Sequence, residues 1–434
     1  MLRRGLLWVC DPINKTSMRL SSLLLLLSAM LIFELSVVMA GSSINKVGAD
    51  SASCSSKQRV IVLTGQKTPA LIGLPIQRIA LYRWTGEHLQ PIVFQIDRRD
   101  EEDRYVFSSE TITKTDTAQI VFDENDELVF LLRDTSLRMP SQSQSDSEGQ
   151  LIEIIINDQQ QVQHWVYVRL LKESGKSSLK HYINYNPETD SVSTNLYQLG
   201  FSRQTPFLVD VFRWWDETGQ QWSPDLLDTM KIRHSGKLFG LLSFNRTHKD
   251  YSSELVAIKV GPVRVIRRTE NRVRVFLGLK SPALTIDYVL SPDGFVMDTL
   301  VDIPFSMGLV FSQLETLTTV DWSSEQGLPA MLINNEQLPD NLQIDGTMSE
   351  KKAAFNKISA TSFGIENSLG TMQVRLDIPE DFPIEAFLYL NDAVQEPDPP
   401  ENIVGQFGNV GFKTTGWENI DTEVKHLLFT VCLY

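Results

Sequence analysis

Hydrophobic and polar residues alternate in many short stretches of this chain after residue 58. The stretch Leu284–Val289 is an example, because every second side chain in it is apolar, as in a strand with one buried face. Turn residues such as Gly261-Pro262 and Ser291–Gly294 separate these stretches. Helical patterns are few, and Glu350–Ile358 is the main helix candidate. The pattern therefore predicts an all-β fold.

The strand candidates fall into two groups on either side of a polar segment, Lys172–Lys180. We expect a small N-terminal β-sandwich at residues 58–172 and a larger antiparallel β-sandwich at residues 173–434. Strands expected in the larger one include Leu238–Phe244, Val263–Arg267, Arg272–Leu277, Leu284–Leu290 and Phe295–Ile303.

The first 40 residues differ from the rest of the chain. Arg3 and Arg4 precede an apolar stretch, Leu23–Phe33, and the small residue Ala40 follows it, which is typical of a cleaved signal peptide. The alternative is an uncleaved membrane anchor, which would be the chain's only membrane contact. Residues 41–57 are polar and rich in Gly and Ser, as in a flexible spacer. We expect a periplasmic or extracellular protein.

The formal net charge of −14 argues against nucleic acid as the main partner, because such a surface repels phosphate backbones. After the leader the chain has two cysteines, Cys54 and Cys432. They could form a disulfide in an oxidising compartment or remain separate thiols. The oligomeric state stays open.

Two short motifs carry a resemblance. Pro91–Asp97 (PIVFQID) is followed by Asp123–Phe130 (DENDELVF), and Tyr185–Val192 (YNPETDSV) comes later. This pattern resembles exported bacterial β-proteins of uncharacterised function that combine such an opening domain with a larger sandwich. The larger sandwich of those proteins is similar to the galactose-mutarotase-like domain of polysaccharide lyases. The resemblance implies a supersandwich-like larger domain, and it concerns the fold more than an activity.

Asp123, Asn125 and Glu127 alternate, so in an extended chain their oxygens point to one side. Oxygen ligands at this spacing suit Ca²⁺, which would be the one candidate cofactor. The alternative is a solvated turn whose carboxylates cap backbone amides.

An aromatic cluster is the main ligand candidate. Trp214, Trp215 and Trp222 could stack on sugar rings, with Arg213 and Asp216 as hydrogen-bonding partners, or the indoles could be core residues. Arg264 and Arg268, on one face of a strand, could bind an acidic polymer or pair with the chain's own carboxylates.

Catalytic candidates are His234, His248, Tyr251 and Arg233. A lyase needs a base and a positive group beside a carboxylate, and these residue types could supply both. The two histidines would come close only if Gly240 marks a turn, and polar loops are the alternative.

These observations favour a carbohydrate-binding or polysaccharide-associated β-protein whose partner is an oligo- or polysaccharide. An enzyme such as a lyase on the same scaffold, and a non-catalytic envelope assembly protein, are the two alternatives.

Overall fold

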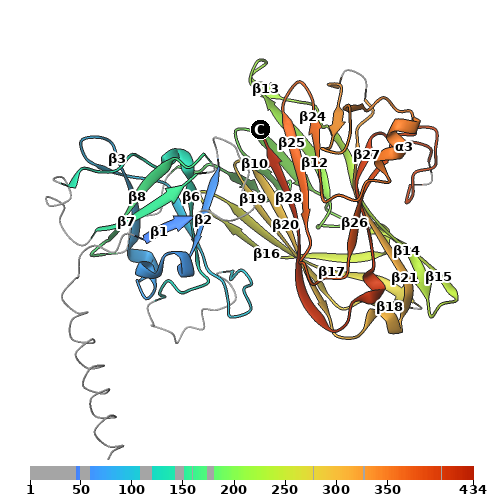
Figure 1. Ribbon diagram of the computed structural model, residues 1–434, viewed down its shortest axis with the longest axis horizontal. Helices are drawn as coiled ribbons and strands as arrows, with labels where there is room; N and C mark the ends of the chain where they lie inside the picture. The colour runs from blue at the N-terminus through green and yellow to red at the C-terminus, as the bar shows by residue number, and fades with distance from the viewer. Residues whose placement is uncertain are drawn as a thin grey trace, which may run out of the picture. The chain divides into compact units, whose positions relative to one another are not determined.

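The computed structural model describes residues 45–48, 59–107, 120–141, 151–158, 160–173, 180–276, 278–325, 328–401 and 403–434. The expected signal peptide and Cys54 lie outside these residues. Asn45–Tyr434 form one compact unit. In the described part of the chain the only α-helix is α3 (Glu350–Phe355), and no helix there is long and apolar enough to cross a membrane. Strands make up most of the rest (Figure 1), so the all-β prediction is confirmed.

The strands up to Leu170 pair with one another in two sheets. One has the order β1-β7-β8-β3-β4 and the other the order β2-β6-β5. Their bounds are β1 (Asn45–Gly48), β2 (Val60–Thr64), β3 (Ile79–Trp84), β4 (Leu89–Pro91), β5 (Phe94–Asp97), β6 (Glu127–Leu131), β7 (Leu151–Asn157) and β8 (Gln163–Leu170). The exact division into two domains stays a prediction.

Three further sheets follow, with the orders β13-β12-β11-β10-β9, β15-β14-β21-β27-β26 and β16-β17-β19-β20-β28-β25-β24-β22-β23, and β18 pairs with β17. The bounds are β9 (Asn184–Asn186), β10 (Ser191–Ser193), β11 (Tyr197–Phe201), β12 (Val209–Asp216), β13 (Gln221–Trp222), β14 (Leu227–Leu238), β15 (Leu242–Thr247), β16 (Tyr251–Val260), β17 (Val265–Phe276), β18 (Leu279–Lys280), β19 (Leu284–Ser291), β20 (Gly294–Ile303), β21 (Phe311–Trp322), β22 (Leu332–Asn334), β23 (Leu342–Gln343), β24 (Ser362–Glu366), β25 (Thr371–Asp377), β26 (Glu385–Asn391), β27 (Asn409–Thr415) and β28 (Glu423–Leu433). Short 3₁₀ turns η5 (His248–Asp250), η6 (Met307–Leu309) and η7 (Trp417–Asn419) connect some of them.

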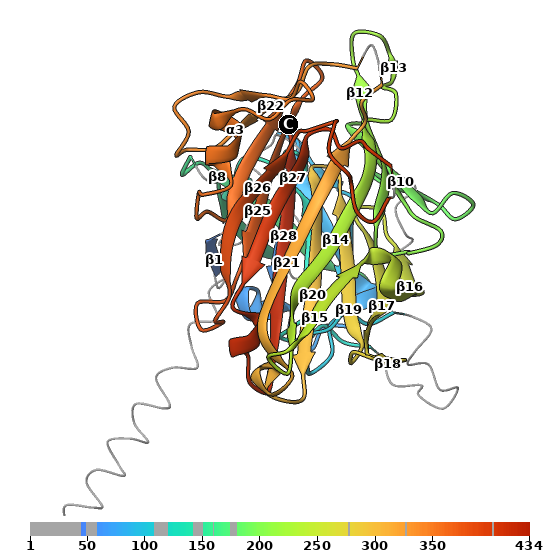
Figure 2. The ribbon, with the colours of Figure 1, turned by 90° about the vertical axis from the view of Figure 1, so that its right-hand side faces the viewer.

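The β15-β14-β21-β27-β26 sheet packs face to face against the sheet that contains β19, β20 and β28. In Figure 2, β14, β21 and β27 lie in front of β19, β20 and β28. Along β14, Met230 and Ile232 point into the shared core, whereas Lys231 and Arg233 point to the other face. The alternation of a half-buried strand thus gives the sandwich its apolar interior.

Three expected strands are wrong in detail. Leu238–Phe244 is not one strand, because the chain turns at Phe239 and Gly240, both with positive φ, and β14 pairs back on β15. Conversely, Val263–Arg267 and Arg272–Leu277 are not separated by a turn. Residues 265–267 and 272–276 belong to one long strand, β17, whose polar middle is paired on both sides by β16 and β19.

The Gln-x-Asp and Asp-Glu motifs form a buried ionic network with the β16–β17 turn. Gln95 accepts hydrogen bonds from the backbone N–H groups of Val263 and Arg264, at 3.2 and 3.0 Å. The Arg264 guanidinium pairs with both Asp97 and Glu127, and all three side chains are buried. Burial opposes the charge of Arg264, but the two carboxylates outweigh it and hold its pKa well above the usual value. These motif residues therefore join the first group of strands to the second.

Replacing the buried Arg264 should destabilise the protein strongly. Arg264→Met leaves Asp97 and Glu127 without their shared cation, and breaking a buried ion pair in this way costs about 3–5 kcal/mol. Lys259→Met is the matched control: Lys259 also pairs with Asp97, at 2.6 Å, but is partly exposed, so its loss should cost less. Urea unfolding measures the free energy of unfolding of each variant. Equal losses of stability in Arg264→Met and Lys259→Met would contradict the central role of Arg264 in the network.

Candidate functional site

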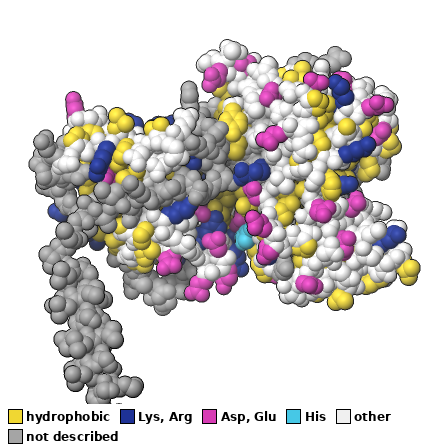
Figure 3. Space-filling view, viewed as in Figure 1, with side chains coloured by type: hydrophobic (Ala, Val, Ile, Leu, Met, Phe, Trp, Pro, Cys, Tyr) yellow, Lys and Arg dark blue, Asp and Glu magenta, His cyan; other side chains and the backbone are white. Residues whose placement is uncertain are grey.

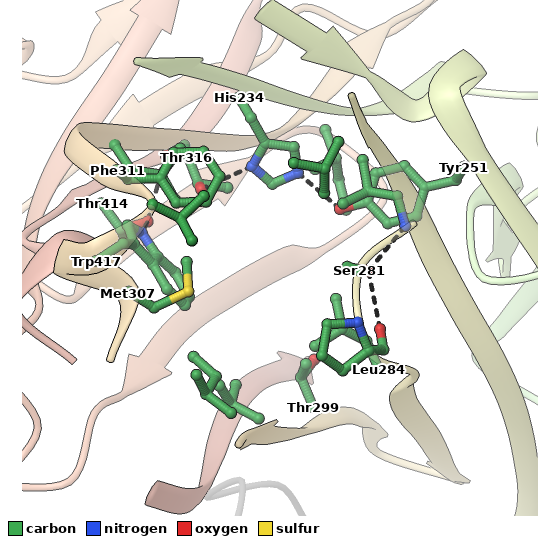
Figure 4. A pocket seen from close by; sticks show the side chains of 18 of the residues that line it. His234, Tyr251, Ser281, Leu284, Thr299, Met307, Phe311, Thr316, Thr414 and Trp417 are labelled. Atoms are coloured by element: carbon green, nitrogen blue, oxygen red, sulfur yellow. Dashed lines mark hydrogen bonds between the residues drawn. The ribbon is translucent and has the colours of Figure 1, made fainter. Parts of the chain in front are cut away.

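A large cavity lies between the two packed sheets. Its volume is about 440 Å³, and its walls come from β14, β15 and β21 on one side and from β16, β17, β19, β20 and β28 on the other. Figure 4 shows Phe311, Met307, Trp417 and Leu284 around this space. Among the lining residues that the structure describes, the charged side chains are Lys280 and Asp302, besides the titratable ring of His234. The cavity is therefore mainly a hydrocarbon-lined space.

The size of this space distinguishes it from a packing defect. Protein interiors are close-packed, with few voids larger than a water molecule. This space of 440 Å³ is open to the surface; as an empty closed void it would cost on the order of 10 kcal/mol, at ~24 cal/mol per Å³. That is comparable with the whole stability of a typical domain. A pocket of this volume with apolar walls and a few polar groups has the properties of a small-molecule site.

A corner between β15 and β16 lies between two lining residues of the cavity, Phe244 and Tyr251. In η5, Thr247 accepts a hydrogen bond from the N–H of Lys249, and Asp250 accepts one from the N–H of Thr247, as in a capping box. The Arg246 guanidinium also donates to the carbonyls of Arg274 and Val275 in β17, at 2.6 and 2.7 Å. The two Arg246 bonds connect β15, an edge strand of one sheet, to β17 in the other sheet.

Three polar side chains on the cavity wall form a hydrogen-bonded chain (Figure 4). His234 Nε2 lies 2.6 Å from the hydroxyl of Tyr251, and His234 Nδ1 lies 2.9 Å from the hydroxyl of Thr316. His234 comes from β14, Tyr251 from the start of β16 and Thr316 from β21. Both sheets therefore contribute to the trio.

The trio keeps one hydrogen that its own bonds do not use. A neutral imidazole carries one N–H, and the two hydroxyls carry one hydrogen each. Two internal bonds consume two of these three hydrogens. In either tautomer, the hydroxyl of Tyr251 or of Thr316 is left with a hydrogen to donate, and neither donates elsewhere in the part of the chain that the structure describes. The wall can therefore bind one acceptor atom of a ligand.

Burial keeps the trio uncharged at neutral pH. It lowers the pKa of His234 to about 4, against a weaker opposite effect of Asp250. It also raises the pKa of Tyr251 well above the usual range. A neutral imidazole and a neutral phenol suit an apolar cavity, because an isolated charge there would be costly.

The structure brings two of the four catalytic candidates together. His234 and Tyr251 share the cavity, whereas Arg233 lies on the opposite face of β14, where it donates to Thr319 at 3.0 Å. His248 is buried in η5, and burial lowers its pKa. The turn at Gly240 brings the segments that contain His234 and His248 side by side, which is the condition that the sequence set for their approach. In this hairpin His234 pairs with Arg246.

The three tryptophans have different environments. Trp214 is 2% exposed and packs in the core against Phe212, so it has no free face for a sugar. Trp215 and Trp222 are half-buried, pair across β12 and β13, and pack edge to face with 5.2 Å between ring centres. Of the polar neighbours, Asp216 caps the following turn by accepting from Thr218 and Gly219, and Arg213 is half-buried.

The two candidate arginines pair with carboxylates of the chain. Arg264 belongs to the network with Asp97 and Glu127, and Arg268 forms a two-pronged pair with Asp287, at 2.7 and 2.8 Å. Of the two alternatives that the sequence left open, the structure therefore shows pairing with the chain's own carboxylates.

The candidate calcium ligands diverge in the structure. Asp123 accepts from the backbone N–H groups of Asn125 and Asp126, at 3.1 and 3.0 Å, which forms a capped turn. Glu127 points instead into the network with Arg99 and Arg264. Within the described ranges, no group of three or more His, Cys, Asp or Glu side chains could hold a metal ion.

Cys432 is disulfide-bonded and lies in β28. The expected partner, Cys54, is outside the described residues, so that pairing stays a prediction.

Several lining residues were not anticipated from sequence. Thr316 and Thr318 come from β21, a strand whose inward positions include threonines and which was not among the strand candidates. Trp417 lies in η7, and its indole N–H donates to Thr414 at 3.0 Å. The alternation of Leu314, Thr316 and Thr318 was the sequence signal for an inward-facing side of this strand. It does not decide the matter, because threonine is equally common on exposed strand faces.

No protein-family model matches the chain, and no curated protein sequence does. Among solved structures, an α-mannosidase from Enterococcus faecalis V583 is 8% identical with a TM-score of 0.37, over 91% of this chain and 42% of that one. A galactose mutarotase-like protein from Lactobacillus casei ATCC 334 is 10% identical with a TM-score of 0.30, over 56% and 99%. Lysyl oxidase from Pichia pastoris is 9% identical with a TM-score of 0.24, over 85% and 71%.

The chain thus spans less than half the length of the mannosidase, and the names of two of these proteins refer to carbohydrates. Because the identities are 10% or lower and the TM-scores are below 0.5, we take no activity from them.

The pKa values of His234, in the cavity, and of His426, which is partly exposed, should differ. We expect His234 to titrate near pH 4, and His426 above its usual pKa because it hydrogen-bonds Asp298 at 2.8 Å. Asp298→Asn should lower the pKa of His426 and leave that of His234 unchanged. NMR shifts of labelled histidine rings measure both, and a His234 pKa near 6.5 would contradict the burial of its ring.

Proposed function

We propose that this protein binds an amphiphilic small molecule whose hydrocarbon part fills the cavity between the two sheets. The observation that carries this proposal is the combination of volume and wall chemistry: about 440 Å³ lined mainly by aliphatic and aromatic side chains. Burial of apolar ligand surface there is favourable by roughly 25 cal/mol per Å². A sugar, by contrast, would lose hydrogen bonds to water without replacement along most of these walls.

The His234–Tyr251–Thr316 trio supports a ligand with one polar group. Its spare hydroxyl hydrogen can be donated to a carbonyl, ester or hydroxyl oxygen. The trio is neutral, so it offers no counter-charge within the cavity and favours an uncharged head group. Fatty alcohols and fatty esters are therefore the preferred ligand class.

Filling the cavity should abolish binding. Thr299 in β20 points into this space (Figure 4), so Thr299→Phe places a ring where the hydrocarbon would lie. We expect at least a tenfold loss of affinity for a fluorescent fatty ester, measured by titration in solution.

Thr371→Phe is the matched control for this experiment. Thr371, at the start of β25, is half-buried like Thr299 but does not line the cavity, so its replacement should leave affinity unchanged. Equal binding by the wild type and Thr299→Phe would contradict the proposed site.

Saccharide binding is a second candidate, favoured by the Trp215–Trp222 pair, whose rings lie half-exposed on β12 and β13. Flat rings of this kind stack on apolar sugar faces. If the Trp215–Trp222 pair binds a saccharide, Trp222→Ala should lose the glycan-array signals of the wild type and keep fatty-ester binding. Absence of any wild-type glycan signal would dismiss this candidate.

The apolar leader predicted at residues 1–40 supports action outside the cytoplasm, in the periplasm or the medium. Fractionation of cells expressing the full chain tests this proposal: an unprocessed cytoplasmic product would contradict it.

A further inference from the structure

Large hydrophobic side chains are exposed on three loops beside the cavity. Phe239 is 64% exposed and Leu241 is 87% exposed in the β14–β15 turn, Leu279 in β18 is 68% exposed, and Leu309 in η6 is 74% exposed. Phe239 and Leu279 also line the cavity, so the cavity reaches the surface between them. We call these four residues the rim. Figure 3 shows hydrophobic side chains at the surface near the position of β15 and β18 in Figure 1.

The rim residues belong to segments that meet at one cavity. The backbone N–H of Phe239 donates to the carbonyl of Val310 at 2.8 Å, which places the β14–β15 turn beside η6. Arg246, at the other end of β15, bonds the carbonyls of Arg274 and Val275 in β17, the strand that precedes β18. The turn and η6 are therefore joined directly, and β18 shares the cavity lining with the turn through Leu279 and Phe239.

The turn itself does not explain its apolar residues. Phe239 has φ of 51° and Gly240 has φ of 73°. Asn, Asp and Gly are the usual residues at positive φ in hairpin turns, and a bulky side chain there is strained. A phenylalanine in this position, followed by the exposed Leu241, points to a role outside the turn. Exposed apolar groups clustered at a pocket commonly mark an interaction surface.

We propose that the rim inserts into the surface of a lipid bilayer and that the ligand passes between the bilayer and the cavity. This inference rests on the proposed function, and it names the source of the ligand. A hydrocarbon ligand has little solubility in water, and an apolar path from bilayer to cavity avoids exposing it. Apolar side chains at the boundary of head groups and acyl chains bind membranes through their buried area.

Charge has a smaller part in this contact. Lys237 and Lys280 lie next to the rim and are exposed, so they can reach head-group phosphates. The exposed Asp302 also lines the cavity and offsets them. The insertion should therefore occur on zwitterionic lipid and depend little on salt.

Vesicle flotation of the full chain with phosphatidylcholine vesicles tests the proposal. Leu241 and Leu309 belong to the rim but are not among the described lining residues, so Leu241→Asp/Leu309→Asp should disrupt docking without changing the cavity. We expect the wild type to float and the double variant to stay mostly in the unbound fraction.

Leu137→Asp is the matched control, because Leu137 is 77% exposed and lies outside the rim and the cavity lining. It should float like the wild type, and thermal unfolding should show all three proteins folded. Wild-type protein that stays with the unbound fraction, or a double variant that floats equally well, would overturn the inference. The inference would also be overturned if no protein floats and the rim instead mediates self-association. In that case the double substitution would abolish the self-association.

Fatty-ester titration without vesicles separates this inference from the proposed function. The double variant should bind the ester as the wild type does. Flotation that depends on the rim, together with no ester binding by the wild type, would refute the cavity's function and leave only the docking surface.

Discussion

Two facing sheets joined by a packed core can still enclose an open apolar space where polar contacts hold their edges together. Here the junction is the β15–η5–β16 corner, where Arg246 bonds the carbonyls of β17 and Asp250 and Thr247 cap each other. Backbone carbonyls and charged donors form the strong hydrogen bonds at this edge. Because the edge is held by polar contacts, the interior beside it need not be filled by the chain's own hydrophobic residues.

The same corner positions the polar groups of the cavity. Tyr251 is the first residue of β16, directly after η5, and His234 lies four residues before the end of β14. Their hydrogen bond at 2.6 Å therefore depends on how the β14–β15 hairpin and the corner fold. Thr316, from β21, completes the trio from the neighbouring strand. The neutral state of the trio follows from its burial and matches the hydrocarbon around it.

The sequence predicted the fold class well because alternation and turn residues act locally. It failed where one residue decides between a strand and a turn: Leu238–Phe244 is apolar enough for a strand, and only the positive φ at Phe239 and Gly240 makes it a hairpin. The pairing of His234 with Tyr251 was within the predicted set, whereas Thr316 and Trp417 were not. A cavity is a property of facing sheets, and no local pattern encodes the distance between them. The Gln95–Asp97 motif, conversely, was visible in sequence, but its contact with Arg264 spans more than a hundred residues.

A crystal structure with a brominated fatty ester would show whether hydrocarbon occupies the space between the sheets. We expect an anomalous bromine peak inside the cavity, among Met307, Thr299 and Phe311, with the ester oxygen within hydrogen-bonding distance of Tyr251 or Thr316. Bromine density found only on the outer surface, with the cavity filled by ordered water or collapsed, would contradict it.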